Sequence, residues 1–168
     1  INYADINYAQ IKNILTNDLS LNKKKSSMRS NQIWKFYYQK GYFNLDLFSN
    51  LPKDLIDELK KIINFSRPKI KNKQISKDGT IKWLLELEDK NLVETVYIPS
   101  DTHSTLCISS QVGCTLNCKF CHTGVQPLVK NLSSNEIINQ IMFAKVELDD
   151  WDEQKKINNT VYMGMGEP

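Results

Sequence analysis

The sequence predicts an α/β protein in three parts, on three observations. Apolar residues recur at helical spacing in the first third of the chain, they alternate with polar residues from Ile81, and a helix signal then stands between two β-rich runs. Strand, helix and strand in this order begin a parallel α/β domain. We therefore expect a helical accessory domain over 1–66, a β-hairpin connection over 67–100 and the start of an α/β core over 101–168.

Three helices account for the first part. Residues 3–16 fit a short helix, and residues 28–39 fit a longer one that stops before Gly41. Pro52 suits a first helical turn, and apolar residues recur at helical spacing behind it as far as Ile63. The aromatic side chains of residues 33–38 are interpreted as core packing rather than as a base-stacking surface.

The remaining elements follow from a change of period. Strands are expected over 81–88, 92–98, 105–109 and 159–163. A turn over 89–91 joins the first two strands, and the segment 111–124 has neither period and is expected to be a loop. Ser133 and Glu136 have the spacing of a capping box, so a helix begins there. The chain stops as the last strand ends, from which we expect a fragment of a longer protein.

Composition and charge narrow the class of protein. The 168 residues are 40% hydrophobic, enough for one modest core or for a small domain and part of another, and no apolar run is long enough to cross a membrane. The net charge of +3 hides an asymmetry, because seven basic residues and no acidic one lie between Lys60 and Lys77, and six and none between Lys23 and Lys40. Such stretches favour a nucleic acid partner or are solvated faces, and charge alone does not separate the two.

The four cysteines indicate a metal site rather than disulfides. Cys114, Cys118 and Cys121 lie within eight residues, and Cys107 lies seven residues before them. Three thiolates at this spacing fit a [4Fe–4S] cluster, which is normally held by four, so one iron would stay open. Structural zinc stays an alternative, although neither Cys107 nor His122 completes a familiar zinc pattern.

Longer motifs around these cysteines resemble a known family. The motifs are Val93-Glu94-Thr95-Val96-Tyr97-Ile98-Pro99, the run from Leu106 to Cys114, Cys118-Lys119-Phe120-Cys121 and Met163-Gly164-Met165-Gly166-Glu167-Pro168. Together they resemble the RlmN/Cfr family of radical S-adenosylmethionine (SAM) methyltransferases, which methylate adenine carbons in RNA. The resemblance runs from about Val93 to Pro168 and is looser in the N-terminal part.

The resemblance implies a partial (β/α) radical SAM barrel and a role for each matching residue. Cys114, Cys118 and Cys121 match the ligands of the [4Fe–4S] cluster, and Cys107 matches the resolving cysteine. Glu94 matches a proton acceptor, and Gly166 and Glu167 match the motif that binds the amino end of SAM. It further implies a cytoplasmic monomer that methylates adenosine C2 in 23S rRNA and tRNA through a methyl-cysteine, with an electron donor such as flavodoxin.

The chain departs from the family pattern in two ways. Thr102-His103 stands where the family has an acidic residue and an arginine, and no match for the methylated cysteine is present, so these residues alone are expected to be inactive. Two other classes of function stay open. One is another radical SAM RNA modifier, such as a methylthiotransferase or an adenine-C8 methyltransferase. The other is a non-catalytic remnant or a zinc-stapled RNA-binding module.

Overall fold

The fold consists of two compact units, residues 1–66 and residues 67–168. The computed structural model describes residues 1–65, 67–116, 118–151 and 156–167. The helices are α1 (Tyr8–Asn13), α2 (Lys23–Lys40), α3 (Lys53–Ile62) and α4 (Ser134–Leu148), with short helical turns at Tyr3–Asp5, Ile14–Asp18, Leu45–Leu47 and Thr123–Val125. The strands are β1 (Lys69–Ile75), β2 (Ile81–Glu86), β3 (Leu92–Ile98), β4 (Thr105–Cys107), β5 (Gln111–Val112), β6 (Lys130–Asn131) and β7 (Asn159–Val161).

Helix α2 shows how local signals set the helices of the first unit. It ends as predicted at Gly41, which adopts the left-handed conformation with φ 66°. It begins at Lys23, five residues before the predicted start, because the Asn22 side chain accepts a hydrogen bond from the Lys25 amide at 2.9 Å. The first turn is polar, so apolar periodicity could not detect it. No helix among the described residues is both long and apolar enough to cross a membrane.

The core of the first unit is aromatic. The Tyr3 ring lies 4.6 Å from the centroids of both Tyr37 and Phe65, and Phe48 packs at 5.7 Å from Phe65. Tyr3, Tyr37 and Phe48 are buried. Phe36 is buried as well, so the prediction that these aromatic side chains form a core is confirmed.

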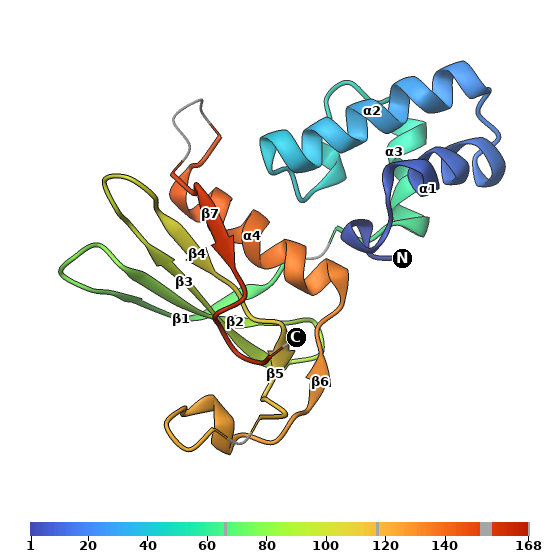
Figure 1. Ribbon diagram of the computed structural model, residues 1–168. Helices are drawn as coiled ribbons and strands as arrows, with labels where there is room; N and C mark the ends of the chain where they lie inside the picture. The colour runs from blue at the N-terminus through green and yellow to red at the C-terminus, as the bar shows by residue number, and fades with distance from the viewer. Residues whose placement is uncertain (66, 117, 152–155, 168) are drawn as a thin grey trace. The chain divides into compact units, whose positions relative to one another are not determined.

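The second unit is a five-stranded sheet with one helix on its face (Figure 1). The strand order is β1-β2-β3-β4-β7, and all neighbours are antiparallel except β4 and β7, which are parallel. Helix α4 connects these two parallel strands, as the strand–helix–strand signal predicted. The predicted α/β fold class is therefore confirmed.

Alternation along the strands builds the core under α4. Trp83 and Leu85 of β2, Val93 of β3 and Leu106 of β4 are fully buried on the same face. The ring of Phe143 from α4 packs edge-on against Trp83 at 5.7 Å. Burial of each such side chain stabilises the fold by about 1.5–3 kcal/mol. This core fixes α4 on the sheet, and with it the segments that adjoin the cysteines.

The sequence did not predict strand β1, nor the short strands β5 and β6, of which β5 lies within the predicted loop 111–124. Strand β1 is the longest of the three. All seven of its residues, Lys-Ile-Lys-Asn-Lys-Gln-Ile, are exposed, so they carry no alternation between apolar and polar positions. It pairs with β2 at the sheet edge, with a register shift between Ile70 and Asn72. Lysines and irregular pairing on an edge strand discourage further strand addition. Residues 67–100 thus contribute three strands to the same sheet as β4 and β7.

Candidate functional site: the cysteine loop and the glycine segment

The loop 113–129, here called the cysteine loop, is closed at its base. Strands β5 and β6 flank it and pair in antiparallel register. Gly113 has φ +78°, and a Cβ at this position would lie 2.1 Å from the Pro127 carbonyl oxygen. Only glycine allows the two ends of the loop to pass this closely. The loop is therefore held at a narrow neck.

The three loop cysteines are free thiols of intermediate burial. The Cys121 amide donates to the Cys118 carbonyl at 3.1 Å, and the Gly124 amide donates to the Cys121 carbonyl at 3.0 Å. A Cβ on Gly124 would lie 2.8 Å from the Cys118 carbonyl oxygen, so glycine lets the turn pack on itself. Within the described residues, no three Cys, His, Asp or Glu side chains gather closely enough to hold a metal ion. Cysteine thiolates are the usual ligands of an iron–sulfur cluster, so the three side chains have the right chemistry. The loop must bring their sulfur atoms closer together to bind one.

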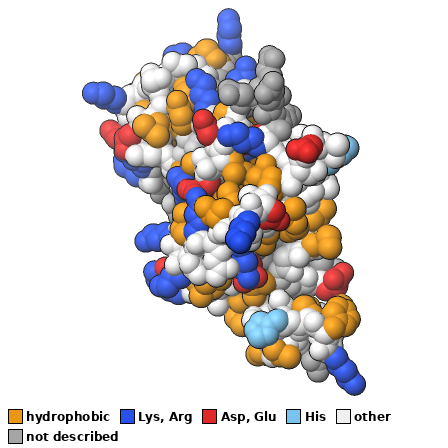
Figure 2. Space-filling view, turned by 90° about the vertical axis from the view of Figure 1, so that its left-hand side faces the viewer, with side chains coloured by type: hydrophobic (Ala, Val, Ile, Leu, Met, Phe, Trp, Pro, Cys, Tyr) orange, Lys and Arg blue, Asp and Glu red, His pale blue; other side chains and the backbone are white. Residues whose placement is uncertain are grey.

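The cysteine loop also carries exposed apolar side chains. Phe120 is 93% exposed, and Leu116 and Val125 are exposed as well. Figure 2 shows hydrophobic side chains gathered at the lower end of the view, where this loop lies. The loop thus presents apolar surface beside its thiols.

Residues 164–167, here called the glycine segment, lie directly against the strand that leads into the loop. The Ser110 amide donates to the Met165 carbonyl at 2.9 Å, and the Glu167 amide donates to the Gln111 side-chain oxygen at 3.1 Å. Gly166 has φ +93°, and a Cβ there would lie 2.5 Å from the Gln111 Cβ. The motif from Leu106 to Cys114 and the glycine segment lie more than 40 residues apart in the sequence, and the fold brings their backbones into contact.

Glu94 and Cys107 share the sheet face opposite to α4. Cys107 on β4 is the register partner of Val96 on β3, and Glu94 lies two residues before Val96, so all three point to the same side. The Glu94 carboxylate forms an ion pair with Lys82 at 2.5 Å. Burial raises the pKa of the Cys107 thiol, so it is protonated at neutral pH and needs a base to become a nucleophile.

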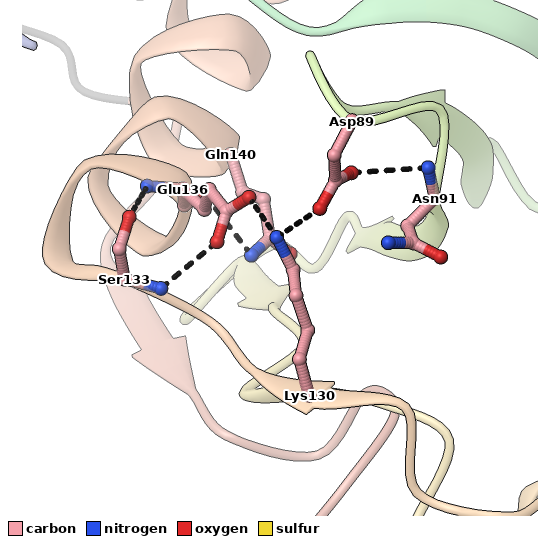
Figure 3. A network of polar contacts seen from close by, with 6 residues as sticks. All are labelled: Asp89, Asn91, Lys130, Ser133, Glu136 and Gln140. Atoms are coloured by element: carbon pink, nitrogen blue, oxygen red, sulfur yellow. Dashed lines mark hydrogen bonds and ion pairs between the residues drawn. The ribbon is translucent and has the colours of Figure 1, made fainter.

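Polar contacts tie both ends of the cysteine loop to α4, and Figure 3 shows those at the exit of the loop. At the exit of the loop, the Lys130 ammonium binds Glu136 at 2.6 Å and also binds Asp89. At the entrance, Gln140 of α4 hydrogen-bonds the backbone of Ser109. The capping box predicted at Ser133 and Glu136 is present.

Sequence reasoning missed the contributions of Ser109, Lys130 and Gln140. One signal existed for Gln140, since it lies on the same helical face as Ile137, Ile141 and Ala144. A polar residue in an apolar stripe is expected to have a buried partner. No comparable signal marks Ser109 or Lys130.

Comparison with known proteins supplies the relatives of this chain. No family model matches the sequence. The chain is 46% identical over 153 residues to the dual-specificity RNA methyltransferase RlmN of Roseobacter denitrificans, covering 87% of the chain and 39% of that protein. It is 42% identical over 172 residues to RlmN of Caulobacter sp. strain K31, covering 100% of the chain and 43% of that protein. The chain thus spans about two fifths of the length of the curated relatives it matches.

A solved structure agrees with these relatives. The fold matches the crystal structure of a radical SAM methyltransferase from Sphaerobacter thermophilus with a TM-score of 0.87 and 30% identity, covering 100% of this chain and 48% of that one. The identity and the fold extend over both units and include the cysteine loop. Over the part of their length that it spans, the chain is thus similar in sequence to the RlmN RNA methyltransferases and in fold to a radical SAM methyltransferase.

Proposed function

We propose that this chain forms part of a radical SAM RNA methyltransferase that methylates C2 of adenosine in 23S rRNA and tRNA. One observation carries the proposal: the glycine segment, distant in sequence, is hydrogen-bonded to Ser110 and Gln111, the residues that lead into the cysteine loop. The RlmN relatives are named as RNA methyltransferases, and the structural neighbour is a radical SAM methyltransferase.

The cluster would be held by Cys114, Cys118 and Cys121. When bound, a reduced [4Fe–4S] cluster with SAM on its open iron supplies a 5′-deoxyadenosyl radical. The chain contributes the three thiolates and a turn whose glycine allows close packing. Its neck holds both ends of the loop, so binding changes the loop without disturbing the sheet.

The glycine segment would bind the amino end of SAM. The Glu167 carboxylate accepts charge-assisted hydrogen bonds from an ammonium group, and glycine at position 166 lets the segment lie against Gln111. The hydroxyl of Ser110, which lies just before the cysteine loop in the chain, is buried and has no hydrogen-bond partner among the described residues. A buried hydroxyl without a partner fits a place where a polar ligand completes the bonding.

Cys107 and Glu94 would serve the later steps, as resolving thiol and proton acceptor. Their place on one sheet face supports a shared site. The raised pKa of Cys107 means that its proton must be accepted before the sulfur attacks. All four cysteines are free, which fits the reducing cytoplasm.

The partners of the proposed enzyme are RNA and an electron donor such as flavodoxin, and the proposed state is a monomer. The two basic stretches, 23–40 and 60–77, differ in how many of their lysines are already ion-paired. Lys71 and Lys73 of β1 form ion pairs with Glu86 and Glu147 at 3.5 and 3.1 Å. Among the described residues no ion pair joins the lysines that begin α2. Both stretches remain candidates for phosphate contacts.

The proposal is tested by anaerobic reconstitution of the chain with iron and sulfide. We expect about four irons per chain and a reduced EPR spectrum that changes when SAM is added. Stoichiometric zinc without iron uptake would instead support a zinc-stapled module. With the complete relative and RNA, the mass of the product nucleoside separates methylation from methylthiolation, and its fragmentation separates C2 from C8.

A further inference from the structure

The side chain of Ser109 joins three segments of the second unit. Its hydroxyl donates to the Glu94 carbonyl of β3 at 2.6 Å and accepts from the Met165 amide of the glycine segment at 2.9 Å. Ser109 is fully buried and lies five residues before the first loop cysteine. One hydroxyl therefore links the glycine segment to the strand that carries Glu94.

Gln140 of α4 holds Ser109 in place from the other side. Its side-chain oxygen accepts from the Ser109 amide at 2.8 Å, and its side-chain nitrogen donates to the Ser109 carbonyl at 2.9 Å. The same oxygen accepts from the Thr95 hydroxyl at 3.0 Å. The side-chain amide of Gln140 thus bonds both the N–H and the carbonyl of Ser109, the two backbone groups that a neighbouring strand would otherwise pair with.

The glycine segment packs directly against Ser109 and Ile108. A Cβ on Gly164 would lie 2.7 Å from the Ser109 hydroxyl oxygen and 2.8 Å from the Ile108 carbonyl carbon. Gly164 also donates its amide to the Ile108 carbonyl at 3.0 Å. The position of Ser109 therefore sets how deeply the segment with Glu167 lies against the strand before the cysteine loop.

We propose that Ser109 and Gln140 are positioning residues for cofactor binding, which hold the glycine segment in register with the cysteine loop. The inference rests on the proposed function, because it takes the glycine segment as the site for the amino end of SAM. Neither residue touches the cofactor in this scheme. Their loss therefore weakens SAM binding and leaves the cluster thiols intact.

The test compares Ser109→Ala, which removes both hydroxyl bonds, with Thr95→Val, which removes one bond to Gln140 and leaves Ser109 in place. Gln140→Met is a second disruptive variant. In the metal-free chain, amide hydrogen exchange at Met165 reports the link itself. We expect exchange to accelerate about tenfold in Ser109→Ala and to stay unchanged in Thr95→Val.

The second readout is the SAM concentration that half-saturates the EPR change of the reconstituted chain. We expect it to rise about five- to tenfold in Ser109→Ala and Gln140→Met, with iron content equal to that of the wild type. Unchanged half-saturation, or loss of iron in place of weaker SAM binding, would overturn the positioning role alone. A wild-type chain that binds iron but ignores SAM would overturn the proposed function and the positioning role together.

Discussion

The two units of this chain satisfy their buried polar groups in different ways. In the helical unit, the buried Ser26 and Ser30 hydroxyls bond to carbonyls four or five residues earlier in the chain. In the sheet unit, Gln140 bonds to Thr95 and Ser109, which are 45 and 31 residues away. The first kind of bond needs only a helix, whereas the second is made only when distant segments are in place. Buried hydrogen bonds between distant segments are thus found in the sheet unit, next to its candidate site.

The largest effect is expected at the cysteine loop itself. Cys118→Ala removes one of three thiolates, so iron uptake should fall from about four per chain to nearly none. Iron and sulfide analysis after reconstitution measures this. Cys107→Ala is the matched control, because Cys107 lies on β4 outside the loop and should leave iron uptake unchanged. Equal iron in both variants would contradict the assignment of the ligands.

The separateness of the units is tested by one core truncation in each. Phe143→Ala and Phe48→Ala each remove a buried ring and should each cost about 3–5 kcal/mol. Amide exchange should show lost protection in the strands for the first variant and in α2 and α3 for the second. Loss of protection throughout the chain from either variant would show a single cooperative unit instead.

RNA binding sharpens the same comparison. Lys69, Lys71 and Lys73 to Ala should weaken RNA binding and reduce the slope of log K against log salt by up to about 2–3, because each phosphate contact contributes roughly 0.7–0.9. The matched triple variant replaces Lys23, Lys24 and Lys25 of α2. A larger effect from α2 would assign the phosphate contacts to the lysines without ion pairs. Unchanged affinity of both variants at low salt would refute an RNA surface in these stretches.

A smaller effect is expected at the exit of the cysteine loop. Lys130→Met leaves Asp89 and Glu136 without their cation and should cost about 1–2 kcal/mol at pH 7, a modest value because the group is partly exposed. Burial opposes ionisation of Asp89, but hydrogen bonds from Lys130 and Asn91 hold its pKa below the ordinary 3.8.

The sign of the pH dependence follows from this lowered pKa. The contribution of Asp89 is fully present above pH 3.8 and is lost as the pH falls through the lower folded value. Urea unfolding should therefore show that the free energies of unfolding of the wild type and of Lys130→Met converge below pH 3.8. Lys90→Met, which breaks the pair with Glu86 at the surface, is the control and should change the stability far less than Lys130→Met. A Lys130→Met deficit that stays constant down to the acid transition would contradict the role of Asp89.

The smallest effect concerns two tyrosines of the helical unit. The Tyr3 hydroxyl is buried without a partner among the described residues, whereas the Tyr8 hydroxyl donates to the Ser27 carbonyl at 3.2 Å. Tyr3→Phe should be neutral or stabilise the unit by up to about 1 kcal/mol, and Tyr8→Phe should destabilise it by about 0.5 kcal/mol. Thermal unfolding of the two variants, which change the same group, measures the difference.

Sequence predicted those features whose causes are local. The capping box at Ser133 and the strand Leu92–Ile98 were predicted with correct limits, because neighbouring residues determine both. Strand β1 escaped prediction because pairing with β2 at the sheet edge, rather than any apolar pattern, makes it a strand. The bond between Ser109 and Gln140 escaped for the same reason, since it depends on segments that meet only in the folded chain. The roles assigned to the site residues stay predictions, which the experiments above test.

The neck at Gly113 has a consequence for how this protein can change. Gly113 and Pro127 lie against each other at the base of the cysteine loop. The residues between them therefore form a closed ring outside the sheet. Insertions or deletions beyond the neck alter the length of a closed ring and leave strand register untouched. Substitutions at exposed positions of the ring, such as Phe120 and Val125, thus cost little stability, whereas a single methyl group at Gly113 would force the ring open.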